Sequence, residues 1–144
     1  MLEFSGYNTS VMWEQAVLFE RSAELGYDSE NFVKCFMTGE TGRQFYIEGD
    51  RMQWAGINYE LECLEEEYED KLTKTGNVFD SDVMYWVGWI YFFWHLFTEE
   101  GPKEIYEQVT CGELADMYLG YHGCSEQLVI ETVKEKKGLP PTHN

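Results

Sequence analysis

The side chains best suited to chemistry are two of the three histidines. His95 closes an aromatic run, and His122 lies in the stretch YLGYHGCSE. Neither belongs to an HExxH motif or lies at metal-ligand spacing from a cysteine or a carboxylate. We therefore expect no metal site and no cofactor. Both histidines are expected to be core or capping residues, unless the fold brings them together in a pocket.

Known catalytic motifs are missing from the sequence. The segment GETGRQ lacks the Lys and the Ser or Thr of a phosphate-binding loop, and neither GxSxG nor GxGxxG occurs. Cys111 or Cys124 beside a histidine would make a nucleophile pair, but a free cysteine is more often simply buried. We expect no catalytic residue, and an enzymatic activity is the less favoured alternative.

Carboxylates are concentrated in residues 59–72, YELECLEEEYEDKL, of a chain with 27 acidic and 10 basic side chains and a net charge of −17. On one helix, Glu62 with Glu66 and Glu66 with Asp70 would be like-charge pairs at four-residue spacing, each modestly destabilising. Such a run is either a solvated face or a surface that docks on Lys and Arg. The candidate partner-binding residues are Glu62, Glu65, Glu66, Glu69 and Asp70. The negative field also repels phosphate backbones and anionic lipids, so we expect no direct nucleic-acid or membrane binding.

The aromatic segment VMYWVGWIYFFWHLF, residues 83–97, offers a second kind of site. It is shorter than the roughly 20 apolar residues of a membrane span, and acidic residues lie on both sides of it. We expect a buried central helix. Aromatic rings with a polar group beside helix 82–100 would also line a small pocket for a planar ligand. The candidate pocket residues are Trp86, Trp94, His95, Tyr121 and His122.

The elements that position these residues are predicted to be helices. Ser10 precedes the apolar-rich run 11–25, Asp28 can cap a second helix, and Thr110 with Glu113 forms a capping box. A stripe from Ile57 to Leu72 predicts one amphipathic helix, and no run alternates as a strand would. The 144 residues therefore predict an all-α, single-domain bundle of six to seven helices around the aromatic one, with residues 1–137 as the domain and 138–144 as a flexible tail.

The cysteine pattern and the first residues indicate a compartment. The four cysteines form no CxxC pair, and no basic-then-apolar signal sequence opens the chain. We expect reduced thiols and a cytoplasmic location.

Three segments carry a resemblance to a known group of proteins: IEGDRMQWAG, YWVGWIYFFWH and MYLGYH. They resemble small, acidic, functionally unassigned proteins of Gram-positive bacteria with a Tyr-Trp-x-Gly-Trp helix and a Met-Tyr…His turn. The resemblance spans roughly residues 41–133. The matching positions are Gly42, Glu48, Gly49, Ala55, Gly56, Glu60, Leu61, Tyr85, Trp86, Gly88, Trp89, Met117, Tyr118 and His122. This resemblance implies toxin–antitoxin or mobile-element loci, and hence an antitoxin or inhibitor.

The expected function is therefore that of an acidic helical protein that binds and inhibits a basic protein partner. Its carboxylates would take the place of phosphates on a toxin or a nucleic-acid-handling defence enzyme. One alternative is a small-molecule binder or enzyme with the aromatic pocket beside helix 82–100. Another is a protein that self-associates through exposed aromatic side chains.

Overall fold

The computed structural model describes residues 5–140, and in that part of the chain the regular elements are all helices, without a strand. This confirms the all-α class and the arrangement around an aromatic-rich helix. Two 3₁₀ helices, η1 (Arg51–Gln53) and η2 (Glu69–Lys71), follow α3 and α4. The α-helices are α1 (Gly6–Glu24), α2 (Ser29–Thr38), α3 (Glu40–Phe45), α4 (Ile57–Tyr68), α5 (Ser81–Thr98), α6 (Pro102–Gln108), α7 (Cys111–Asp116), α8 (Tyr118–Tyr121) and α9 (Glu126–Lys136).

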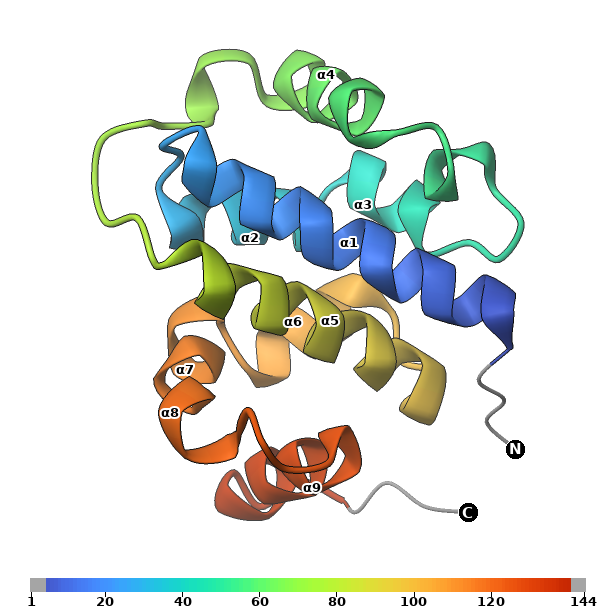
Figure 1. The fold of residues 1–144 in the computed structure, drawn as a ribbon, viewed down its shortest axis with the longest axis vertical. Coiled ribbons are helices and arrows are strands. Elements are labelled where there is room, and N and C mark those ends of the chain that lie inside the picture. The colour runs from blue at the N-terminus through green and yellow to red at the C-terminus, as the bar shows by residue number, and fades with distance from the viewer. Residues whose placement is uncertain (1–4, 141–144) are drawn as a thin grey trace.

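Helices α1 and α5 run antiparallel through the middle of the molecule, while α4 and α9 lie at opposite ends of its long axis (Figure 1). Their close approach depends on Gly88. A Cβ atom there would lie 2.8 Å from the Gln15 carbonyl oxygen and 2.9 Å from Ala16 Cα. The buried Gln15 side chain also donates from Nε2 to the Gly88 carbonyl oxygen at 2.8 Å. Gly88 therefore permits the close approach, and the buried hydrogen bond adds to the side-chain packing between the two helices.

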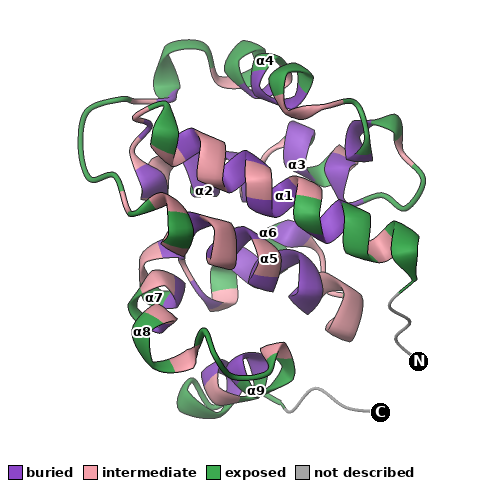
Figure 2. Cartoon of the chain, viewed as in Figure 1, coloured by how far each residue is buried: buried purple, intermediate pink, exposed green. Residues whose placement is uncertain are grey.

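The aromatic helix α5 is the centre of the core in its second half. Tyr91 and Trp94 are fully buried, and Figure 2 shows buried positions of α1 and α5 facing the middle of the molecule. The first half differs, because Tyr85, Trp86 and Trp89 remain half-buried. The prediction of a central aromatic helix is confirmed, but one stretch of it faces outward.

Helix starts follow the capping residues. The backbone N–H of Asn31 donates to Asp28, and Thr110 with Glu113 forms the predicted capping box. Helix α1 instead begins at Gly6, because Ser5 accepts a hydrogen bond from the Asn8 N–H. The predicted start at Ser10 was therefore wrong, and Ser10 donates to the Gly6 carbonyl oxygen inside the helix.

The acidic helix is shorter than the stripe from Ile57 to Leu72 predicted. Helix α4 ends at Tyr68. The backbone of Glu69 then adopts φ 48°, ψ −118°, a conformation that residues other than glycine seldom take. Leu72 is still buried, but from an extended position after η2. Burying Leu72 therefore takes priority over continuing the helix. Of the predicted tail 138–144, residues 141–144 lie outside the described residues.

Candidate functional site

Four of the five predicted partner-binding carboxylates form an exposed set, here called the α4 acidic set: Glu62, Glu66, Glu69 and Asp70. Within residues 5–140 none of the four has an ion-pair or hydrogen-bond partner. Because α4 ends at Tyr68, only Glu62 and Glu66 share a helical face, while the other two lie on η2.

Glu65, the fifth predicted residue, has a structural contact. Its carboxylate accepts a hydrogen bond from the hydroxyl of Tyr27. Burial and this carboxylate raise the pKa of Tyr27 to about 12. Glu65 is an exposed residue. Its contact with Tyr27 nevertheless helps attach α4 to the loop that follows α1.

Carboxylates outside the acidic set cap helices within the fold. Glu67 accepts the backbone N–H groups of Glu40 at 2.6 Å and Thr41 at 2.9 Å, at the start of α3. Glu30 accepts those of Cys111 at 3.1 Å and Gly112 at 2.7 Å, at the start of α7. Negative charge at a helix N-terminus is stabilising. The acidic composition therefore has an internal use as well as an exposed remainder.

The five residues predicted to line one aromatic pocket do not share a cavity. Trp94 is fully buried, and its indole N–H donates to Glu100 at 2.7 Å. His95 lines a cavity of about 110 Å³ beside Tyr46. Its Nδ1 lies 2.7 Å from the Glu100 carbonyl oxygen, and burial lowers the pKa of His95. At neutral pH the ring is therefore an uncharged donor to that carbonyl.

Trp86 and His122 are the two predicted pocket residues that meet. They line a recess of about 250 Å³ between α5 and α9, here called the α5–α9 cleft, which is lined by Tyr85, Trp86, Trp89, His122, Cys124 and Glu126. The Trp89 indole N–H donates to Glu126 Oε2 at 2.9 Å. The sequence signal that could have identified Tyr85 and Trp89 is their four-residue spacing, which places both rings on one helical face.

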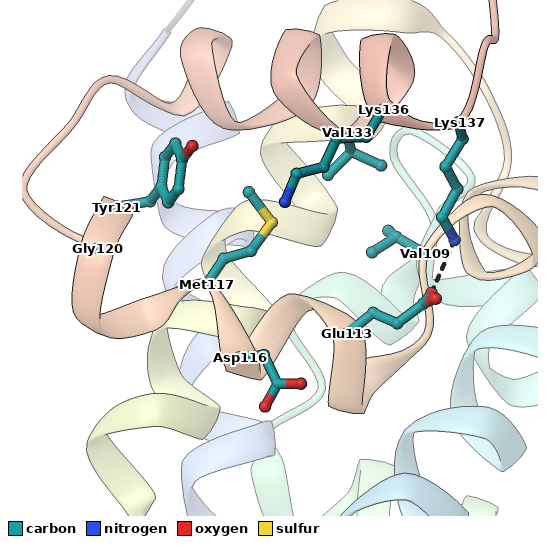
Figure 3. Close-up of a pocket in the computed structure, with 9 residues that line it drawn as sticks. All are labelled: Val109, Glu113, Asp116, Met117, Gly120, Tyr121, Val133, Lys136 and Lys137. Carbon is teal, nitrogen blue, oxygen red and sulfur yellow. Dashed lines mark hydrogen bonds and ion pairs between the residues drawn. The ribbon is translucent and has the colours of Figure 1, made fainter.

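Tyr121, the fifth predicted pocket residue, lines a different cavity of about 350 Å³ between α7, α8 and α9. Figure 3 shows Lys136 extending from α9 toward Met117, while Lys137 pairs with Glu113 at 2.8 Å. Val109 and Val133 complete an apolar wall. Such a cavity suits a small apolar molecule with an anionic end, but the net charge of −17 opposes anion binding.

A buried carboxyl pair joins α4 to α1. Glu60 is 1% exposed, and neither of its carboxyl oxygens, nor Oε2 of Glu14, has a hydrogen-bond partner among the described residues. Burial and the neighbouring Glu14 carboxyl raise the pKa of Glu60 to about 10. Two ionised carboxylates only accept hydrogen bonds, so a hydrogen bond between them requires a proton on one of them. The pair therefore holds a proton at neutral pH.

The described residues 5–140 hold neither a cluster of metal ligands nor a membrane-spanning helix. Residues 5–140 contain no group of three or more His, Cys, Asp or Glu side chains that could hold a metal ion. No helix in that range is both long and apolar enough to pass through a bilayer. All four cysteines are free thiols, and Cys111 is buried with its sulfur 3.9 Å from that of Met84.

Comparison with known proteins adds no family to this description. No protein-family model matches the chain, and no curated protein or solved structure is significantly similar to it. The resemblance to small acidic proteins of Gram-positive bacteria remains a prediction. Two of its glycines have a physical reason in this fold, since a Cβ at Gly42 would meet the Phe36 carbonyl oxygen at 1.7 Å and Gly88 lies at the crossing of α1 and α5.

Proposed function

We propose that this protein is a cytoplasmic, acidic, helical interaction protein that binds a basic protein partner and blocks it, as an antitoxin or an anti-defence inhibitor would. The observation that carries this proposal is the α4 acidic set. Elsewhere in the fold, carboxylates such as Glu30 and Glu67 cap helices, whereas these four point to solvent without a partner in the described part of the chain.

The proposed mechanism is substitution for phosphate groups. Lys and Arg side chains that hold a nucleic-acid backbone would form charge-assisted hydrogen bonds with these carboxylates instead. The overall negative field would steer the partner and speed its association, and this effect falls as salt screens it. The occupied basic surface could then no longer bind its own ligand.

The proposal is tested with a charge-matched pair of variants. The first replaces Glu62, Glu66 and Glu69 by Gln and Asp70 by Asn. The control removes the same number of charges elsewhere by replacing four exposed glutamates with Gln: Glu104, Glu107, Glu131 and Glu135. Both variants and the unchanged protein are used to capture partners from a bacterial lysate at low salt, and the association rate with each captured protein is then measured across salt concentrations.

The expected result is a basic protein whose association is slowed about tenfold or more by the first variant, with a flatter salt dependence, and much less by the control. That protein should also lose its own activity when the unchanged chain is bound. If both variants slowed association equally, the α4 acidic set would act only through the net charge, which would contradict the proposed site.

A further inference from the structure

We propose that the α5–α9 cleft binds an arginine side chain of a basic polypeptide. The identity of that polypeptide as the inhibited partner rests on the function proposed above, but the cleft itself does not. Helices α4 and α9 lie at opposite ends of the long axis (Figure 1). The cleft is therefore a second contact, separate from the α4 acidic set and testable without it.

Aromatic rings form most of the cleft. Tyr85 and Trp89 lie nearly parallel, with an interplanar angle of 12° and ring centroids 6.4 Å apart. Trp86 meets Tyr118 edge to face, and Tyr118 stacks on His122 at 4.3 Å. Half-buried rings with accessible faces attract cations through their quadrupole, most strongly tryptophan.

The charges around the cleft are negative. Glu126 binds Trp89 through Oε2, and its Oε1 has no partner in the described part of the chain. Burial and the carboxylate of Glu20 on α1 raise the pKa of Tyr85. The described residues that line the cleft include no Lys or Arg. The Nδ1 atom of His122 is 2.7 Å from the Tyr118 carbonyl oxygen, so this nitrogen is already occupied.

An arginine side chain fits this combination better than the other ligand classes. Its guanidinium is planar, always charged and weakly hydrated, so it stacks on a ring while its N–H groups donate to a carboxylate. An anion would face Glu126 and a net charge of −17. A neutral planar ligand with an N–H group would also stack on the rings and donate to Glu126, but it would bring no positive charge to the rings or to the carboxylate.

The experiment follows the indole N–H resonances of the five tryptophans by two-dimensional NMR of the ¹⁵N-labelled full chain. The probe is the capped tripeptide Gly-Arg-Gly, and its matched control carries citrulline, which has the same shape but no charge. We expect the arginine peptide to shift the Trp89 and Trp86 signals in a saturable manner while Trp94 stays in place, and the citrulline peptide to shift neither. Equal shifts with both peptides, or none at Trp86 and Trp89 with the arginine peptide, would overturn the proposal.

A variant pair then tests the role of the carboxylate. Glu126→Gln is expected to weaken binding of the arginine peptide about threefold to fivefold. Glu131→Gln removes an equal charge from the same helix, where Glu131 accepts a hydrogen bond from its neighbour Gln127, and should leave the affinity unchanged. Unshifted Trp13, Trp54 and Trp94 signals verify that each variant is folded. Equal weakening by both variants would assign the binding to general attraction and contradict the cleft.

The same titration separates this inference from the proposed function. In the variant that neutralises the α4 acidic set, the arginine peptide should still shift Trp89. If this variant still inhibits the partner and still binds the peptide at Trp89, the α4 acidic set is not the inhibitory site, and the cleft remains supported. If peptide binding at Trp89 disappears with the α4 carboxylates, the cleft is not an independent site and the inference fails.

Discussion

Single carboxyl groups in this protein occupy very different environments, and Glu60 is the most extreme. It is buried against Glu14 without a cationic partner in the described structure. Its raised pKa lies above the ordinary glutamate value of about 4.3, so the folded state binds this proton more tightly than the unfolded chain does. The resulting stability is complete below about pH 4 and is lost as the pH rises toward about 10.

The replacement Glu60→Gln should therefore stabilise the fold at alkaline pH. An amide has the same shape, needs no proton and can donate to Glu14, so we expect a gain of about 1–3 kcal/mol in the free energy of unfolding near pH 9 and a smaller one near pH 6. Urea unfolding at the two pH values measures this difference.

The control for Glu60 is Glu62→Gln, which removes an equal charge from the exposed face of the same helix. It should change stability by only a few tenths of a kcal/mol and leave the pH dependence as it is. If both variants showed the same pH profile, the carboxyl pair would not be the group that titrates.

At the scale of the elements, the contact between α1 and α5 allows no side chain at position 88. Gly88→Ala would push a methyl group against the backbone of Gln15 and Ala16. Overpacking of this kind costs about 1–3 kcal/mol, and we expect a corresponding fall in the urea midpoint. The comparison is Gly120→Ala in α8, where a Cβ meets nothing within 4 Å, and which should not lower the midpoint.

Helices α5, α6 and α9 are tied together by one buried lysine. Lys134 Nζ donates to Glu100 Oε2 at 2.9 Å and to Gln108 Oε1 at 2.7 Å, and it lies 5.6 Å from the centre of the Trp94 ring. Burial alone would raise the pKa of Glu100, but hydrogen bonds from Lys134, Trp94 and Gln108 hold it below its usual value. The carboxylate therefore stays charged within the network.

Lys134→Met should be strongly destabilising, because it leaves Glu100 charged and without its cation. Removing one partner of a buried pair costs about 3–5 kcal/mol, measured as the free energy of unfolding in denaturant. Lys137→Met removes a more exposed cation that pairs with Glu113 and should cost about 1 kcal/mol or less. Similar losses in the two variants would show that the network around Lys134 adds nothing beyond a surface pair.

For the whole molecule, the net charge of −17 sets a repulsion that every fold of this chain must overcome. Salt screens such repulsion, so raising NaCl from about 10 mM to about 0.5 M should raise Tm. The variant that neutralises the four α4 carboxylates should show a smaller rise, because it carries less charge. A rise of equal size in both proteins would assign the effect to the general action of salt on apolar surface.

Local patterns in the sequence determined much of this architecture. The capping residues Asp28 and Thr110, the apolar spacing of the helices and the aromatic segment specify helices and a buried centre, because capping and amphipathic burial depend on neighbours a few residues away. The same local information also predicted the exposure of Glu62 and Glu66.

Only the tertiary structure decided which distant residues meet. The sequence offers aromatic and histidine side chains as equivalent pocket candidates, but helix packing separates them. It places Trp94 in the core and lets three separate cavities receive His95, Tyr121 and His122. The same packing brings the Trp89 indole to Glu126. It also buries Glu60 against Glu14 and ends α4 at Tyr68, so that Leu72 can reach the core. These outcomes depend on the relative placement of whole helices, a long-range balance of packing that no short stretch of sequence contains.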